Sequence, residues 1–278
     1  MQIIDAHHHL WDRGRFIYSW LKERPPIDRD YLLRDYEEAI QGSGVVKSVF
    51  VQAGVDEPFA MQEARWALSM AQGSGPVAGV VAWAPVERPD LEDYLEKLGE
   101  DDHLKGIRRL IQGEADDFCA RPEFVAGVEK VAARGLSFDL CIYHPQLAAA
   151  VELVRQVPQA SFVLDHIGKP GIKEGLMEPW SRQIGELAQL DNVVCKLSGL
   201  VTEADLDNWT PQDLRPYIER VVEVFGYDRL MFGSDWPVST LAASYDRWLE
   251  VVYQALEGAS QAEKEQVLQG TAARFYQL

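Results

Sequence analysis

The sequence Ile3-Ile4-Asp5-Ala6-His7-His8-His9-Leu10-Trp11-Asp12 opens the chain with a short apolar run that leads directly into three histidines. An apolar run of this length is typical of a buried strand. Because successive side chains of a strand point to opposite faces, His7 and His9 project to one side and His8 to the other. The stretch therefore predicts half of a metal site, since two imidazoles on one rigid strand can bind the same cation.

Seven further apolar runs, rich in Val, Ile, Leu and Phe, follow this first strand along the chain, and stretches of helical periodicity separate them. The predicted strands are residues 45–53, 77–85, 104–112, 136–144, 161–168, 192–199 and 230–237. The predicted helices are residues 31–41, 57–72, 91–99, 123–134, 147–156, 180–189, 211–225, 245–256 and 261–269. Eight strand–helix units in 278 residues predict an α/β fold, a single-domain (β/α)8 TIM-type barrel over residues 1–278, with a doubly wound open sheet as the alternative.

Composition and charge narrow the class of protein. A net charge of −17 argues against a nucleic-acid partner, because phosphate binding needs a basic face. No apolar run is long enough to cross a membrane and no secretory leader opens the chain, so we expect no membrane partner and a cytoplasmic location. The three cysteines are scattered without a CxxC pair, which predicts free thiols. The sequence leaves self-association into a homo-oligomer open.

The active site of a barrel lies at the carboxyl ends of its strands, so the polar residues there carry the functional prediction. These residues are His7, His9, Gln52, Arg108, Arg109, Tyr143, His144, Asp165, His166, Lys196, Ser198 and Asp235. Convergence of His7, His9, His166 and Asp235 on one rim predicts a single site that can hold a metal ion. A barrel that served only as a binding or regulatory module would have no use for this set.

The neighbouring charged residues have predicted orientations. The Arg108 guanidinium suits a carboxylate or a polarised carbonyl, whereas an ion pair at the strand end is the alternative. Alternation along the strands turns Arg109 to the opposite side and predicts that Asp165, next to His166, faces away in a structural role. Lys196 is expected to bind a substrate carboxylate or neutralise Asp235, with an ion pair inside the barrel as the alternative.

Aromatic and hydroxyl-binding side chains complete the predicted substrate site. Tyr143 and His144 suit contacts with substrate hydroxyls, or packing behind the site. Tryptophans near the rim can stack on a sugar ring or fill the core. Of Trp11, Trp20, Trp83 and Trp236, we expect Trp11 and Trp236 to contact substrate because they lie nearest the motifs. Residues 13–30, with Trp20 and two prolines, are predicted to form a lid.

Five blocks in order along the chain resemble the amidohydrolase superfamily. They are Asp5-Ala6-His7-His8-His9-Leu10-Trp11-Asp12, Lys105-Gly106-Ile107-Arg108, Leu164-Asp165-His166-Ile167-Gly168-Lys169-Pro170, Cys195-Lys196-Leu197-Ser198-Gly199-Leu200 and Gly233-Ser234-Asp235-Trp236-Pro237. More narrowly, they look like the amidohydrolase-2 group, which includes fuconolactonases, rhamnonolactonases and the 2-pyrone-4,6-dicarboxylate lactonase.

The resemblance implies a hydrolase in which His7, His9, His166 and Asp235 surround the reaction centre. Binuclear members use a bridging Lys or Glu at the end of the fourth strand, where this chain has arginines, so the resemblance implies at most one divalent metal ion, Zn²⁺ or Mn²⁺. Some relatives work without a metal. In that case Arg108 and the histidines of this chain would stabilise the oxyanion. In both versions Asp235 is the general base that activates water on the lactone carbonyl. A small sugar lactone is the expected substrate, a carboxylated lactone such as a pyrone dicarboxylate is the second reading, and metal-dependent decarboxylation on the same scaffold is the third.

Overall fold

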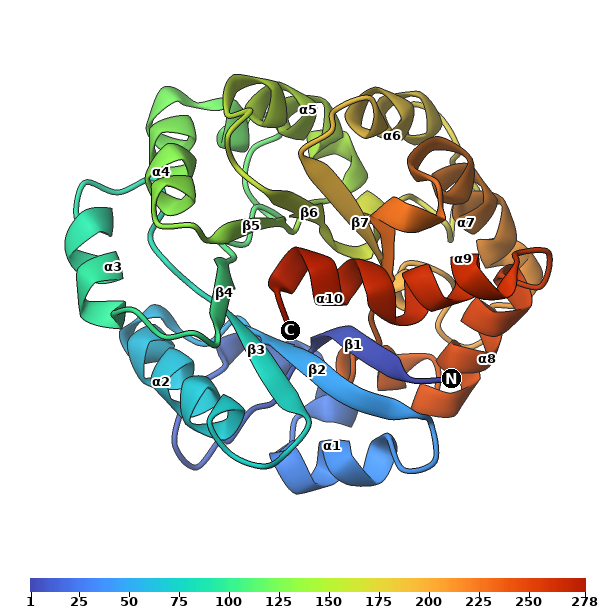
Figure 1. Ribbon diagram of the computed structural model, residues 1–278, viewed down its shortest axis with the longest axis horizontal. Coiled ribbons are helices and arrows are strands. Elements are labelled where there is room, and N and C mark those ends of the chain that lie inside the picture. Colours follow the sequence, from blue (N-terminus) through green and yellow to red (C-terminus); the bar gives the residue numbers. More distant parts are fainter.

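Eight parallel strands alternate with helices around the closed ring of Figure 1, in a computed structural model that describes residues 1–278. The sheet order runs from β1 to β8 in sequence order, which confirms the predicted (β/α)8 barrel and excludes the open sheet. The strands are β1 Ile3–His8, β2 Val45–Val51, β3 Val77–Ala82, β4 Leu104–Ile107, β5 Ser137–Leu140, β6 Phe162–Leu164, β7 Val193–Leu197 and β8 Leu230–Phe232. The helices are α1 Leu33–Ala39, α2 Ala60–Ala71, α3 Leu91–Leu98, α4 Pro122–Ala133, α5 Leu147–Gln156, α6 Trp180–Ala188, α7 Pro211–Phe225, α8 Tyr245–Ala255, α9 Gln261–Glu265 and α10 Thr271–Tyr276.

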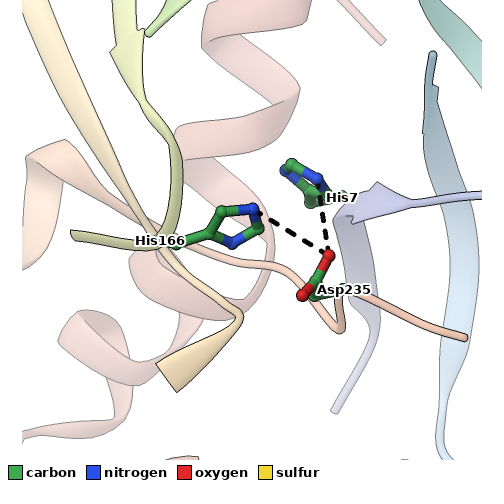
Figure 2. Close-up of side chains that lie close together, drawn as sticks. All are labelled: His7, His166 and Asp235. Carbon is green, nitrogen blue, oxygen red and sulfur yellow. Dashed lines mark ion pairs between the residues drawn. The ribbon is translucent and has the colours of Figure 1, made fainter. Parts of the chain in front are cut away.

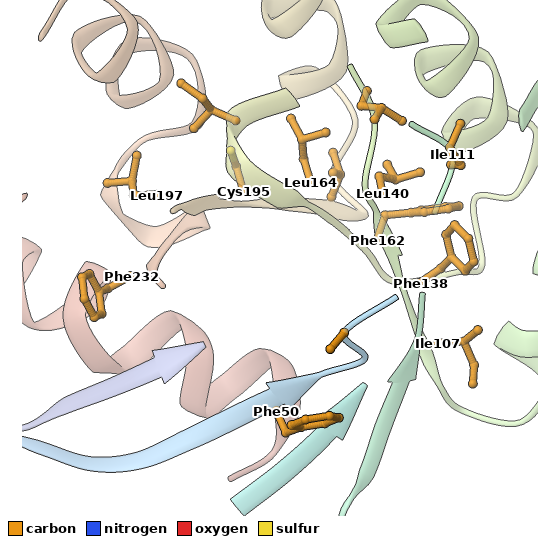
Figure 3. Packing of buried hydrophobic residues seen from close by; sticks show 14 of the residues in the cluster. Phe50, Ile107, Ile111, Phe138, Leu140, Phe162, Leu164, Cys195, Leu197 and Phe232 are labelled. Carbon is orange, nitrogen blue, oxygen red and sulfur yellow. The ribbon is translucent and has the colours of Figure 1, made fainter. Parts of the chain in front are cut away.

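Two apolar cores hold the barrel together. The larger core lies between the strands and the surrounding helices, where Phe50, Phe138 and Phe162 pack among aliphatic side chains (Figure 3). The smaller core fills the barrel interior and includes Val163 and Met231. Burial of both strand faces explains why the strands have continuous apolar sequences instead of alternating ones.

The junction between β1 and β8 is closed largely beyond the end of β8. The backbone N–H of Asp235 donates to the carbonyl of His7 at 2.8 Å, and that of His9 donates to the carbonyl of Trp236 at 2.7 Å. The buried Asp5 carboxylate adds a second link, because it accepts from the Ser234 N–H at 2.8 Å. The Tyr36 and Tyr245 hydroxyls also donate to Asp5, at 2.9 and 3.1 Å.

A C-terminal helix that the sequence did not predict covers the other end of the barrel. Helix α10 crosses the ring in Figure 1, and its Ala272 and Tyr276 pack into the interior core. Lys105, at the start of β4, donates to the carbonyl of Gln277 at 3.3 Å. With this end blocked, the carboxyl ends of the strands are left as the open rim.

The three cysteines are free, as predicted, and all three are buried. No helix of the structure has the length and apolar character that a membrane span requires.

Candidate active site

The structure brings the four predicted metal ligands together at the carboxyl ends of β1, β6 and β8. The Nε2 atoms of His7 and His9 lie 3.2 Å apart. Asp235 Oδ1 lies 3.3 Å from His9 Nε2, 3.8 Å from His7 Nε2 and 3.9 Å from His166 Nε2. All four residues are at least 95% buried. Figure 2 shows His7, from β1, and His166, from the segment after β6, directing their rings toward the Asp235 carboxylate.

Each imidazole is held through its other ring nitrogen. His9 Nδ1 lies 2.8 Å from the Val51 carbonyl and His7 Nδ1 lies 3.2 Å from Asp165 Oδ1. Since a carbonyl and a carboxylate only accept, we assign the ring proton of both histidines to Nδ1, which leaves the Nε2 lone pairs facing each other. His166 Nδ1 lies 2.9 Å from the Ser198 hydroxyl.

The arrangement fits a divalent cation. Two lone pairs that face each other across 3.2 Å repel unless a cation or proton lies between them, and a carboxylate beside them supplies a negative charge. Metal-binding histidines generally have a carboxylate or carbonyl partner on the second nitrogen, as His7 and His9 have here. His7, His9, His166 and Asp235 would hold the ion.

The backbone leaves the strand conformation at the residues that carry the site. His166 has φ 54° and Asp235 has φ 55°, in the left-handed region that side-chain-bearing residues seldom adopt. The predicted strands 161–168 and 230–237 therefore end early, at Leu164 and Phe232. Gly199 faces both residues: a Cβ there would lie 2.4 Å from His166 Nδ1 and 3.0 Å from Asp235 Oδ2.

Burial and neighbouring charges determine the protonation of the site. Burial lowers the pKa of His7 well below its usual range and lowers that of His166 to about 4. Burial alone would raise the pKa of Asp235, but His166, the hydrogen bond with His9, and His7 outweigh it and hold this pKa below the usual range. At neutral pH His7 and His166 are thus neutral beside an ionised carboxylate.

A cavity of about 340 Å³ opens onto this cluster. Its lining residues are His9, Trp20, Glu23, Arg24, Ala53, Gly54, Arg108, Leu110, Gln112, Cys141, His166, Lys169, Thr202, Asp235 and Val238. Trp20, Glu23 and Arg24 come from the segment predicted as a lid, which therefore covers the site. The lid is fastened by Trp20 Nε1, which donates to the Ala53 carbonyl at 2.9 Å, and by the Ser19 hydroxyl, which donates to Asp56 at 2.6 Å.

The charged residues predicted around the site divide into two groups. Arg108 lines the cavity and donates to Asp165 Oδ2 at 3.1 Å and to the Gln52 carbonyl. Arg109 turns away, as predicted, and pairs with glutamates outside the site. Lys196 does not reach the cavity. It is fully buried inside the barrel, where it forms ion pairs with Asp139 and Asp165, as the alternative prediction had it.

The expectation that Asp165 faces away from the barrel interior is wrong. Its two oxygens bind His7, Arg108 and Lys196. Strand alternation predicted the opposite orientation, but β6 ends at Leu164, so alternation no longer applies at Asp165.

Four residues predicted to contact substrate do not line the cavity. Trp11 is buried under the lid, where its Nε1 donates to the Arg29 carbonyl, and Trp236 is buried against Tyr31. Tyr143 is exposed and His144 is half-buried outside the lining. Among the tryptophans named from the sequence, Trp20 lines the cavity, whereas Trp11 and Trp236 lie outside its lining. Lid residues are hard to choose from sequence, since their position depends on how the lid folds over the rim.

Two further lining residues, Lys169 and Cys141, lie outside the predicted set of site residues. Lys169 donates to Gln112 Oε1 at 2.6 Å and lies 3.7 Å from Glu203. Cys141, Asp165 and His166 also place ligand atoms within 4.8 Å of one another, but the Asp165 oxygens are already occupied by three partners. The run Ile167-Gly168-Lys169-Pro170 directly after His166 was the signal that could have identified Lys169.

This constellation on a (β/α)8 barrel defines a hydrolase of the amidohydrolase type, and the amidohydrolase family model matches residues 4–278, so the chain belongs to that family. The L-fucono-1,5-lactonase of Burkholderia ambifaria is 34% identical over 99% of this chain and 95% of its own length. An uncharacterized protein of Sinorhizobium fredii is 32% identical over 99% of this chain and 98% of its own. The crystal structure of an amidohydrolase from Burkholderia multivorans with bound zinc superimposes with a TM-score of 0.91 at 33% identity, covering both chains completely.

Proposed function

We propose that this amidohydrolase is a lactonase that opens a neutral sugar lactone, with Asp235 as the general base. The observation that carries the proposal is the ionised Asp235 carboxylate among three imidazole Nε2 atoms on the wall of a cavity of about 340 Å³. A cavity of this size suits a single small ring. The similarity to a fuconolactonase over nearly the whole chain supports the choice of a sugar lactone.

The residues of the chain have distinct roles in this proposal. Asp235 takes a proton from the attacking water and later delivers it to the departing ring oxygen. His7, His9 and His166, with Asp235, would hold one Zn²⁺ or Mn²⁺ ion, which would supply a positive charge to polarise the lactone carbonyl. Arg108 lines the cavity, where its guanidinium can donate to an oxygen of the substrate. Trp20 offers an apolar face to the ring.

The charge around the cavity favours a neutral substrate over a carboxylated one. Arg108 is paired with Asp165, and Lys169 is held by Gln112 and Glu203. A dicarboxylate substrate would need several cations, and Arg108, Lys169 and Lys196 are those nearest the site. Lys196 is buried inside the barrel, outside the cavity lining. A carboxylated lactone would have to displace these partners.

A pH-indicator assay of ring opening tests the proposal on a panel of neutral sugar lactones and carboxylated lactones, with protein as purified and after chelation. We expect acid release from a sugar lactone that disappears on chelation and returns with Zn²⁺ or Mn²⁺. Activity that is unchanged after chelation would contradict the role of the metal. Turnover of carboxylated lactones alone would contradict the substrate class, and carbon dioxide release from an aromatic acid would favour decarboxylation instead.

A further inference from the structure

A fully buried chain of charged side chains runs through the barrel interior from Tyr276 to His7. The Tyr276 hydroxyl donates to Asp139 Oδ2 at 3.3 Å, and Lys196 Nζ donates to the same oxygen at 2.6 Å. Lys196 Nζ also lies 3.0 Å from Asp165 Oδ1. The side chains of Asp139, Lys196 and Asp165 are all 0% exposed, so none of them can contact a substrate in the cavity.

This chain meets the active site at Asp165 and at His7, whose Nδ1 also lies 3.4 Å from Lys196 Nζ. Asp165 Oδ1 accepts from His7 Nδ1 at 3.2 Å, while its Oδ2 accepts from Arg108 Nη1 at 3.1 Å. One carboxylate therefore orients both a predicted metal ligand and the arginine that lines the cavity. Asp165 Oδ1 is shared, because Lys196 and His7 both approach it.

The charges in this cluster balance. Asp139 and Asp165 are two carboxylates, and Lys196 and Arg108 are two cations. Removing Lys196 would leave two buried carboxylates with one cation, which is costly in a low-dielectric interior.

We infer that Lys196 is a positioning residue for the reaction centre: with Asp139 it fixes the Asp165 carboxylate, which in turn holds His7 in the Nδ1–H tautomer and aims Arg108 at the cavity. The Nε2 lone pair of His7 then faces Asp235. The inference rests on the proposed role of His7 as a metal ligand.

The main test replaces Lys196 with methionine, which keeps the length of the stem and removes the charge. We expect the Zn²⁺ affinity of the metal-free protein, measured by competition with a chelator, to fall about 10- to 100-fold, the range typical of partners behind a ligand. We expect kcat to fall with it, whereas KM should change less, because no residue of the cavity lining is itself replaced. Arg109→Met is the matched control, since Arg109 follows Arg108 but pairs with Glu87 and Glu114 outside the site.

A second variant keeps the inference testable if Lys196→Met does not fold. Asp139→Asn combined with Lys196→Met removes one charge of each sign, and neutral replacement of a buried pair is often tolerated. We expect this double variant to show the same loss of Zn²⁺ affinity.

A third measurement needs neither metal nor turnover. The ring ¹⁵N signals of His7 in metal-free protein, assigned with His7→Gln, should show a protonated Nδ1 in the wild type and mixed tautomers in both Lys196 variants. Failure of the wild type to bind Zn²⁺ would contradict the proposed function, and the His7 signals would still decide this inference. Folded variants with wild-type Zn²⁺ affinity, kcat and His7 signals would overturn it.

Discussion

The backbone N–H of Asp235 donates to the carbonyl of His7 at 2.8 Å, so the proposed base is fastened to the strand that carries two of the proposed metal ligands. This bond is made by the main chain and does not depend on the Asp235 carboxylate. The side chain is therefore open to a change that tests chemistry without loosening the barrel.

Asp235→Asn should abolish most of the turnover while the fold is kept. An amide of the same shape cannot accept the proton of the attacking water, and loss of a general base typically costs about 10²- to 10⁴-fold in rate. The measurement is kcat/KM on the best lactone, with a thermal melt as the control for folding. Near-normal activity would contradict the assigned mechanism.

Trp20→Ala should raise KM about tenfold and change kcat little. The indole lines the cavity, and losing its stacking on a sugar ring is expected to cost about 1.4 kcal/mol, which corresponds to a factor of ten. Trp20→Phe keeps an aromatic face but loses the hydrogen bond to Ala53, so it separates stacking from fastening of the lid. Trp11→Phe is the control, because Trp11 does not line the cavity; an equal effect of that change would argue against a wall formed by Trp20.

The activity should withstand moderate acid. Burial lowers the pKa of His166 to about 4, so this ring stays neutral until the pH approaches that value, and Asp235 remains ionised over the same range. We expect kcat/KM to be level from neutral pH to about pH 5 and to fall below it as His166 gains a proton. A fall centred near 6.5, the value of an unperturbed histidine, would show that burial does not control His166.

Gly199→Ala should damage the site more than its size suggests. Gly199 has φ 65°, where an L side chain costs about 1–2 kcal/mol, and its Cβ would lie 2.4 Å from His166 Nδ1. We expect a lower melting temperature together with loss of activity, because His166 must move. Gly175→Ala is a matched control: Gly175 has φ 67° but nothing within 4 Å of a Cβ. Equal activity losses in the two variants would exclude the clash as the cause.

The free energy of unfolding should decline between about pH 4.5 and pH 8 because of Glu63. Burial raises the pKa of this carboxyl, which lies on α2, to about 8. The folded protein keeps this proton above the unfolded pKa, near 4.5, where the unfolded chain releases it. The free energy of unfolding therefore falls as pH rises from about 4.5 to 8, by about 1.4 kcal/mol per pKa unit of difference. Glu63→Gln should remove this slope and be more stable than the wild type at pH 9, as urea unfolding at pH 6 and pH 9 can measure. An unchanged slope would place the titration elsewhere.

The strand order and the four central residues could be predicted from local patterns alone. Each buried strand of a barrel is apolar on both faces, so eight apolar runs separated by amphipathic stretches already indicate the architecture. The rule that catalytic groups lie at the carboxyl ends of strands then selects His7, His9, His166 and Asp235, because each follows an apolar run. The orientation of the Asp165 side chain could not be predicted in this way, because β6 ends at Leu164 and the alternation of side chains along a strand does not extend beyond it.

The sequence by itself determined the barrel, the family motifs and which residues meet at the carboxyl ends of the strands, because periodicity and motif order are local properties. Only the tertiary structure decided how deep each side chain lies and which partner it meets. Lys196 lies beneath the cavity and not in it, and Trp20 replaces Trp11 as the aromatic wall. The physical reason is that these contacts join residues far apart in the chain, such as Lys196 with Asp139 and Trp20 with Ala53, and close packing of the whole barrel selects them.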